Sequence, residues 1–331
     1  MYGGEMLELR AVAIAVLSTQ AGIGASERAH KLLNNSKDKK SNRLSTEKSK
    51  KKVYIKQNLR ILDNLADQFY TADPGLFGPD SVSWQVHGDF SSMLIGGISA
   101  LMLQALHPLA LAGVWDHSNF RQDMLGRLRR TSQFISGTTF GSRKDADWLI
   151  EKVRTIHLQV VGHAPDGRAY AASDPQLLTW VHVAEVSSFL AAHVRYRNPQ
   201  LSGRDQDRYY NEIALVAERL GARNVPRSRE EIADYLARIR PQLLCDARSR
   251  EVLRLLLEAP APSTLAKPFG ALMMQAGIDL LPAWAADMLG QHPSPLQRQL
   301  VRAGVKRSAP VLRWAMRNGS VQRAHRRMGL M

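Results

Sequence analysis

Residues 90–115 read FSSMLIGGISALMLQALHPLALAGVW and contain no Asp, Glu, Lys or Arg, while Asp89 and Asp116 bracket the run. A helix of this length is long enough to cross a bilayer. Its serines and its His-Pro pair, however, are poorly suited to face lipid. We therefore predict a buried central helix over residues 91–113, kinked at Pro108, with a membrane span as the alternative.

Helical periodicity also dominates the sequence downstream of this run, and convincing two-residue alternation is absent. Ser173-Asp174-Pro175 is a typical helix start, with a capping residue before proline. Ser228 and Glu231 have the spacing of a capping box, and Pro165-Asp166-Gly167 predicts a turn. The sequence predicts an all-α fold with further helices after Ser118, over 145–161, 175–196 and 202–220, after Ser228, over 272–281 and from Pro295.

The net charge of +15 is concentrated at the two ends of the chain. Residues 1–56 hold twelve Lys/Arg against five Asp/Glu, and residues 291–331 hold nine Lys/Arg and no acid. We predict a poorly structured basic segment over 1–56, an all-α domain over 57–290 and a basic helical tail over 291–331. Basic ends suit a peripheral contact with membrane headgroups. Nucleic acid is not an expected partner, because that interpretation requires a basic patch on the folded body.

Several classes of protein are disfavoured by what the sequence lacks. Cys245 is the only cysteine, so neither an intramolecular disulfide nor a cysteine-cluster metal site can form. We find no Gly-rich phosphate loop, no His-Glu-x-x-His pair and no Gly-x-Ser-x-Gly elbow. No convincing secretory signal is present. We expect a cytoplasmic protein that also associates with a membrane surface.

His157 is the first candidate site residue, because it shares a helical stripe with Leu149, Val153 and Val160. An imidazole on an apolar stripe needs partners for its ring nitrogens. One interpretation is a core histidine with hydrogen-bond partners. The other is an axial ligand to haem iron, for which a single histidine suffices. His107 and His182 are rival metal ligands, and each is also interpretable as a core histidine.

Arg127, Arg130 and Thr131 stand at i, i+3 and i+4 and therefore share one helix face. Guanidinium groups on such a face suit carboxylates or a developing charge on oxygen. Thr131 would hydrogen-bond bound dioxygen or water. The alternative is a solvated basic face.

These pieces together resemble the family that groups rubber oxygenase (latex clearing protein) with the fungal oxygenase mpaB. The resemblance covers roughly residues 65 to 260, and it lies in the order of several short motifs. They are Gly96-Gly97, LMLQALHPLALAGV (Leu101–Val114), Asp116-His117-Ser118, RLRRT (Arg127–Thr131), Phe140-Gly141, VRTIH (Val153–His157), YAASDP (Tyr170–Pro175) and LLTWVH (Leu177–His182).

The resemblance implies a globin-like helical bundle with extra helices that holds haem b. It implies His157 as the proximal iron ligand, with Arg127, Arg130 and Thr131 on the distal side. Arg130 replaces the family's lysine with a larger planar group. The family's distal glutamate aligns near Leu111, where this chain has no acid.

The function that we predict is a haem b-dependent oxygenase that uses O2 on an apolar or lipid-like substrate. The first alternative is a non-catalytic binder of haem or of an apolar ligand. The second is a basic adaptor at a membrane surface.

Overall fold

A computed structural model describes residues 73–259, 267–315 and 319–330 of the chain. The predicted segment 1–56 lies outside these residues. The chain divides into two compact units. One comprises residues 74–321, and the described residues of the other are Asp73 and 322–330.

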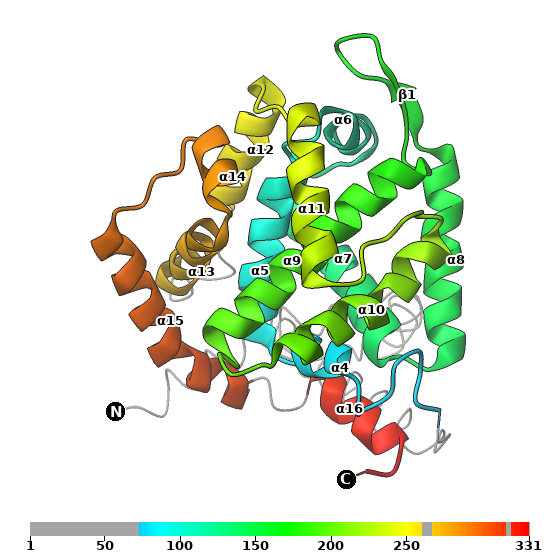
Figure 1. Ribbon diagram of the computed structural model, residues 1–331, viewed down its shortest axis with the longest axis vertical. Coiled ribbons are helices and arrows are strands. Elements are labelled where there is room, and N and C mark those ends of the chain that lie inside the picture. The colour runs from blue at the N-terminus through cyan, green and yellow to red at the C-terminus, as the bar shows by residue number, and fades with distance from the viewer. Residues whose placement is uncertain (1–72, 260–266, 316–318, 331) are drawn as a thin grey trace, which may run out of the picture. The chain divides into compact units, whose positions relative to one another are not determined.

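The described residues form thirteen α-helices, one short 3-10 helix and one two-stranded antiparallel sheet (Figure 1). The prediction of an all-α fold is confirmed, and the globin-like arrangement stays a prediction. The elements are α4 (Val82–His87), α5 (Phe90–Gln104), α6 (Pro108–His117), α7 (Met124–Phe140), α8 (Arg143–Gln159), β1 (Val161–His163), β2 (Ala169–Ala171), α9 (Pro175–Tyr196), α10 (Gly203–Leu220), α11 (Arg229–Ile239), η2 (Arg240–Gln242), α12 (Ala247–Leu257), α13 (Lys267–Leu280), α14 (Ala283–Met288), α15 (Pro295–Ala315) and α16 (Ser320–Arg327).

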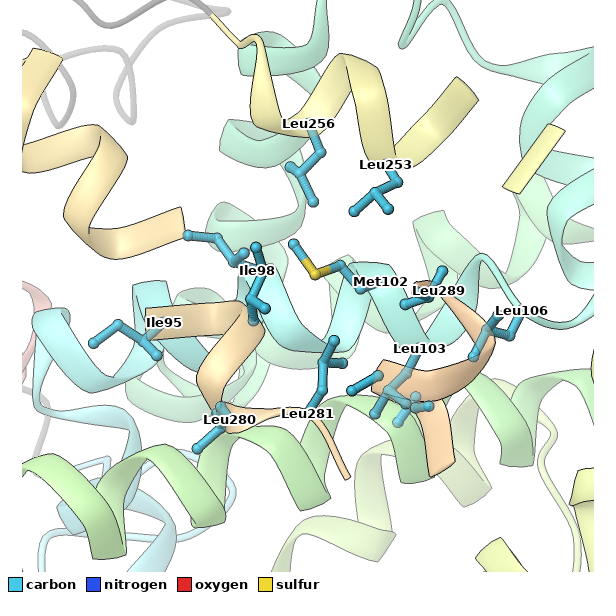
Figure 2. Packing of buried hydrophobic residues seen from close by; sticks show 14 of the residues in the cluster. Ile95, Ile98, Met102, Leu103, Leu106, Leu253, Leu256, Leu280, Leu281 and Leu289 are labelled. Atoms are coloured by element: carbon cyan, nitrogen blue, oxygen red, sulfur yellow. The ribbon is translucent and has the colours of Figure 1, made fainter. Parts of the chain in front are cut away.

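Helices α5 and α9 form the centre of the larger unit and run side by side (Figure 1). Gly96 of α5 sets their separation, because a Cβ atom there would lie 2.9 Å from the Cα atom of Phe189. On the other side of α5, Leu253 and Leu256 of α12 point toward Met102 (Figure 2). Because α5 is covered on both sides, its sequence is apolar all round.

The apolar run is two helices and not one kinked helix, so that prediction was wrong. Helix α5 ends at Gln104, α6 begins at Pro108, and the two axes differ by 105°. His107 caps α6, since its Nδ1 accepts a hydrogen bond from the Ala110 N–H at 3.4 Å. Pro108 at the first helical position has no N–H to leave unpaired. The proline therefore begins a helix in a new direction.

By length and hydropathy, α9 could cross a membrane, and so could α5 and α6 if the bent pair counts as one span. Two-thirds of the α9 window is buried inside the protein. Core helices of soluble proteins have the same character, so this composition is weak support for a span.

Most predicted helix starts are confirmed, and two are wrong, because α13 begins at Lys267 and not at 272, and α7 does not begin after Ser118. Asp174, Ser202 and Ser228 cap α9, α10 and α11 through their side chains. Ser118 does not begin the next helix. Helix α7 starts later, where Asp123 accepts from the Gly126 N–H at 2.8 Å. Ser118, Asn119 and Asp123 can all cap a helix, and the sequence alone does not show which of them does so.

A short hairpin of β1 and β2 was not predicted from the sequence. Val161 pairs with Ala171 and His163 with Ala169. Three residues per strand are too few for a two-residue alternation to be recognised. The predicted turn between them is confirmed, because Gly167 has a φ of 85° that favours glycine.

Substitution of Gly96 tests the contact between the two central helices. Gly96→Ala is expected to destabilise the protein by about 1–3 kcal/mol, because its Cβ would press against backbone. Gly97→Ala is the matched control, since its nearest neighbour, a Phe189 ring carbon, is 3.8 Å away. Because alanine has a higher helix propensity than glycine, Gly97→Ala should stabilise the protein by up to about 1 kcal/mol. Urea unfolding of both variants measures the difference, and equal stabilities would contradict the close contact at Gly96.

Candidate functional site: an apolar cavity beside His157

A cavity of about 290 Å³ lies where α6 turns away from α5. This volume is at the lower end of the roughly 300–1,000 Å³ typical of small-molecule sites. The cavity's surface is mainly apolar, and its lining comes from α5, α6, α7, α8, β2, α9, α12 and the loops between them. Among the lining residues are Leu101, Ala105, Leu109, Leu111, Val114, Phe120, Val160, Leu177, Val181, Val252 and Leu256.

His157 lies in the last turn of α8 and lines this cavity. Its Nδ1 atom is buried and has no hydrogen-bond partner among the described residues. Burial lowers the pKa of the ring below its usual value, so the imidazole is neutral near pH 7. A neutral imidazole with an unpaired nitrogen is the form that binds a metal ion.

Arg127 lies in the first part of α7. Of the three predicted polar residues Arg127, Arg130 and Thr131 (the triplet), it is the one that lines the cavity. Burial lowers the pKa of its guanidinium, nearby Arg130 lowers it further, and Glu185 opposes both effects. The side chain is half-buried. A positive charge is thus held at a mainly apolar wall.

Arg130 and Thr131 are placed differently from Arg127. The Arg130 side chain is 58% exposed, donates to Oδ1 of Asn119 at 3.2 Å and lies 3.8 Å from Asp123. Thr131 is half-buried, and neither residue is among those lining the cavity. Of the triplet, the structure brings Arg127 alone together with His157.

The rival ligands His107 and His182 are both buried but lie outside the cavity lining. His107 is engaged by its capping hydrogen bond, whereas Nε2 of His182 has no partner among the described residues. Burial lowers the pKa of each ring to about 4. Both are therefore neutral core histidines at pH 7.

Glu185 is a half-buried acid of α9 that sequence reasoning missed. It stands one turn after Val181, a cavity residue whose carbonyl accepts from Gln104 Nε2 at 3.3 Å. Burial raises the pKa of its carboxyl to about 7, while Gln104 and Arg127 lower it. The available signal was an acid within the apolar helix, four residues after Val181 and eight after Leu177, and therefore on the same helix face.

Asp116 and His117 hold the hairpin at the rim of the cavity. The hydroxyl of the lining residue Tyr170 donates to Oδ2 of Asp116 at 2.7 Å, and His117 Nε2 lies 3.2 Å from the Val161 carbonyl. Burial, followed by Asp116, raises the pKa of Tyr170 to about 12. Gly162 leaves room for this ring, because a Cβ there would be 2.5 Å from the tyrosine oxygen. His117 and Ser118 are themselves among the residues that line the cavity.

Comparison with protein families identifies the class of the domain that holds this cavity. Residues 84–314 match the family described as ER-bound oxygenase mpaB/B′/Rubber oxygenase, catalytic domain. The match covers more than half of the chain, and the chain belongs to this family. The resemblance found in the sequence is confirmed, and the domain is an enzyme domain of the oxygenase type. No curated protein and no solved structure matches the chain.

The pKa of Glu185 makes a testable contribution to stability. A carboxyl with a raised folded-state pKa favours folding at low pH, and this contribution is lost as pH rises from about 4.5 through about 7. We compare the free energy of unfolding of Glu185→Gln with that of wild type at about pH 5 and at about pH 8. The difference between variant and wild type should shift by about 1–3 kcal/mol in favour of the variant at the higher pH. Urea unfolding at both pH values measures this gain.

The exposed Glu230 provides the control, and Glu230→Gln should show no such gain. If Glu185→Gln behaves like Glu230→Gln at both pH values, the carboxyl of Glu185 is not held protonated by burial.

Proposed function

We propose that this protein is a haem b-dependent oxygenase that acts with O2 on an apolar, lipid-like substrate. The observation that carries the proposal is the buried, unpartnered Nδ1 of His157 at the wall of an apolar cavity, in a chain that belongs to an oxygenase family.

The residues around the cavity fit this cofactor. A buried polar atom without a partner costs free energy, and iron bound to the ring of His157 would recover it. A porphyrin already supplies four iron ligands, so one histidine is enough. The apolar walls suit the face of the macrocycle, and Arg127 suits a carboxylate at its edge.

When bound, haem supplies the one-electron and dioxygen chemistry that amino-acid side chains lack. Within this proposal, His157 binds and orients the group from the end of α8. The apolar residues of α6 and α9 exclude water from the cavity, which we also call the chamber. Arg127 presents a positive charge that stabilises an anionic oxygen atom or a carboxylate.

Glu185 adjusts the electrostatics of this chamber. With a pKa of about 7, its carboxyl is partly protonated at neutral pH. When the proton is held, the charge of Arg127 is uncompensated, and when the proton is lost, the carboxylate offsets that charge. Arg130 and Thr131 would reach the chamber only after a change of side-chain position, and their distal role stays a prediction.

Haem binding by histidine variants tests the ligand assignment. Titration of purified apoprotein with haem should give a Soret band that shifts in His157→Ala. The affinity should fall by more than about tenfold, because even outer-shell partners of metal ligands contribute about that much.

His107→Ala and His182→Ala are the matched controls, since both rings are buried but lie outside the cavity lining. They should leave the spectrum of the bound haem unchanged. A shift confined to either control would assign the iron ligand to that histidine instead.

A second measurement separates an oxygenase from a non-catalytic binder. Haem-loaded protein with a reductant should consume O2 and oxidise an apolar substrate. A well-folded protein that binds haem through His157 but forms no product would support the binder instead.

A further inference from the structure

Helix α15 has one face that is buried in the core and one face that is exposed. Residues along an α-helix are about 100° apart, so Val301, Val305 and Ala309 share one face. This face packs into the core, where Val305 and Ala309 are only 1% exposed. In Figure 1, α15 is an outer helix and packs next to α13.

Two arginines anchor the inner side of α15. Arg302 donates to both oxygens of the buried Asp279, through Nε at 2.8 Å and a terminal nitrogen at 3.0 Å. Arg313 donates to the buried Asp89 and, at 3.2 Å, to the carbonyl of Tyr196. These charge-assisted bonds fix the rotation of the helix about its axis. Part of the positive charge of the tail is thus neutralised within the fold.

The outer face of α15 carries an apolar stripe that is interrupted by positive charge. Leu296, Leu300, Arg307 and Val311 stand at i, i+4, i+11 and i+15 and therefore lie on one side of the helix. Leu296 is 64% exposed, Leu300 63% and Val311 43%. We call these four residues, with the exposed Lys306 on the flank about 100° around the axis from Arg307, the outer stripe. Exposed leucines in register along a helix are a pattern typical of interaction surfaces.

The charge of this face is uncompensated. Lys306 and Arg307 are exposed and form no ion pair with the described residues. Residues 288–331 contain no Asp or Glu. A basic helix with leucines on its exposed side is the chemistry that recognises an anionic lipid surface, because the apolar side chains enter the headgroup boundary and the cations meet phosphates.

We propose that the outer stripe of α15 docks the protein on an anionic lipid bilayer, with the helix parallel to the surface. The inner arginines hold the helix rigidly, so the stripe is already ordered before it binds. The proposal is independent of the cofactor, and apoprotein and haem-loaded protein should bind equally.

Co-sedimentation of the full chain with vesicles tests the proposal. Wild type should bind vesicles with roughly 25% phosphatidylglycerol, bind neutral phosphatidylcholine vesicles at least about tenfold more weakly, and release with added salt. Leu296→Ser with Leu300→Ser, and separately Lys306→Glu with Arg307→Glu, should each weaken binding at least about tenfold.

Matched controls carry the same changes on exposed sites elsewhere: Leu158→Ser with Leu244→Ser, and Lys144→Glu with Lys152→Glu. These should bind as wild type does. Stripe variants that bind like the controls would overturn the proposal. So would stripe variants that dissociate a lipid-free oligomer in sedimentation velocity, because the stripe would then be an interface between copies of this chain.

Discussion

The close approach of α5 and α9 at Gly96 constrains the rest of the larger unit. Because Gly96 has no side chain, the backbone of α9 lies directly against α5 at Phe189. At Gly96 the two helices leave no space between them. The chamber instead forms where α5 ends, and the 105° turn into α6 gives it a wall. The His107 cap and Pro108 mark the start of α6 after that turn.

The cavity has mainly apolar walls, and three polar groups whose burial is unfavourable in isolation lie at or near it. His157 has an unpaired ring nitrogen, Arg127 holds a positive charge, and Glu185 is an acid with a pKa of about 7. Groups of this kind are tolerated where they act on a ligand. Two of them, His157 and Arg127, line one cavity, and Glu185 stands one helical turn from the lining residue Val181. This arrangement, in a member of an oxygenase family, is what the proposed cofactor at His157 would account for.

The sequence predicted local features of the fold well. Caps at Asp174, Ser202 and Ser228 act between residues only a few positions apart, and so a single sequence reveals them. The break before Pro108 was interpreted as a kink, because the sequence shows that a proline interrupts a helix but not by what angle the chain continues. The direction of α6 depends on packing against distant segments such as β2 and α12.

The candidate site was predictable in part for the same reason. Helical spacing placed Arg127, Arg130 and Thr131 on one face, but it could not show that Arg130 extends to Asn119 at the surface. Glu185 was overlooked because its importance comes from Arg127 and Gln104, which belong to other helices. A lone acid in an apolar helix acquires meaning only when its tertiary neighbours are known.

The most direct test is a hyperfine measurement on haem-loaded protein labelled with ¹⁵N-histidine. Pulsed electron paramagnetic resonance should detect coupling between the iron and one imidazole nitrogen. That coupling should vanish in His157→Gly and should not return when unlabelled imidazole is added to restore the haem spectrum. If the ¹⁵N coupling persists in His157→Gly, another histidine holds the iron, and the cavity beside His157 is not the haem site.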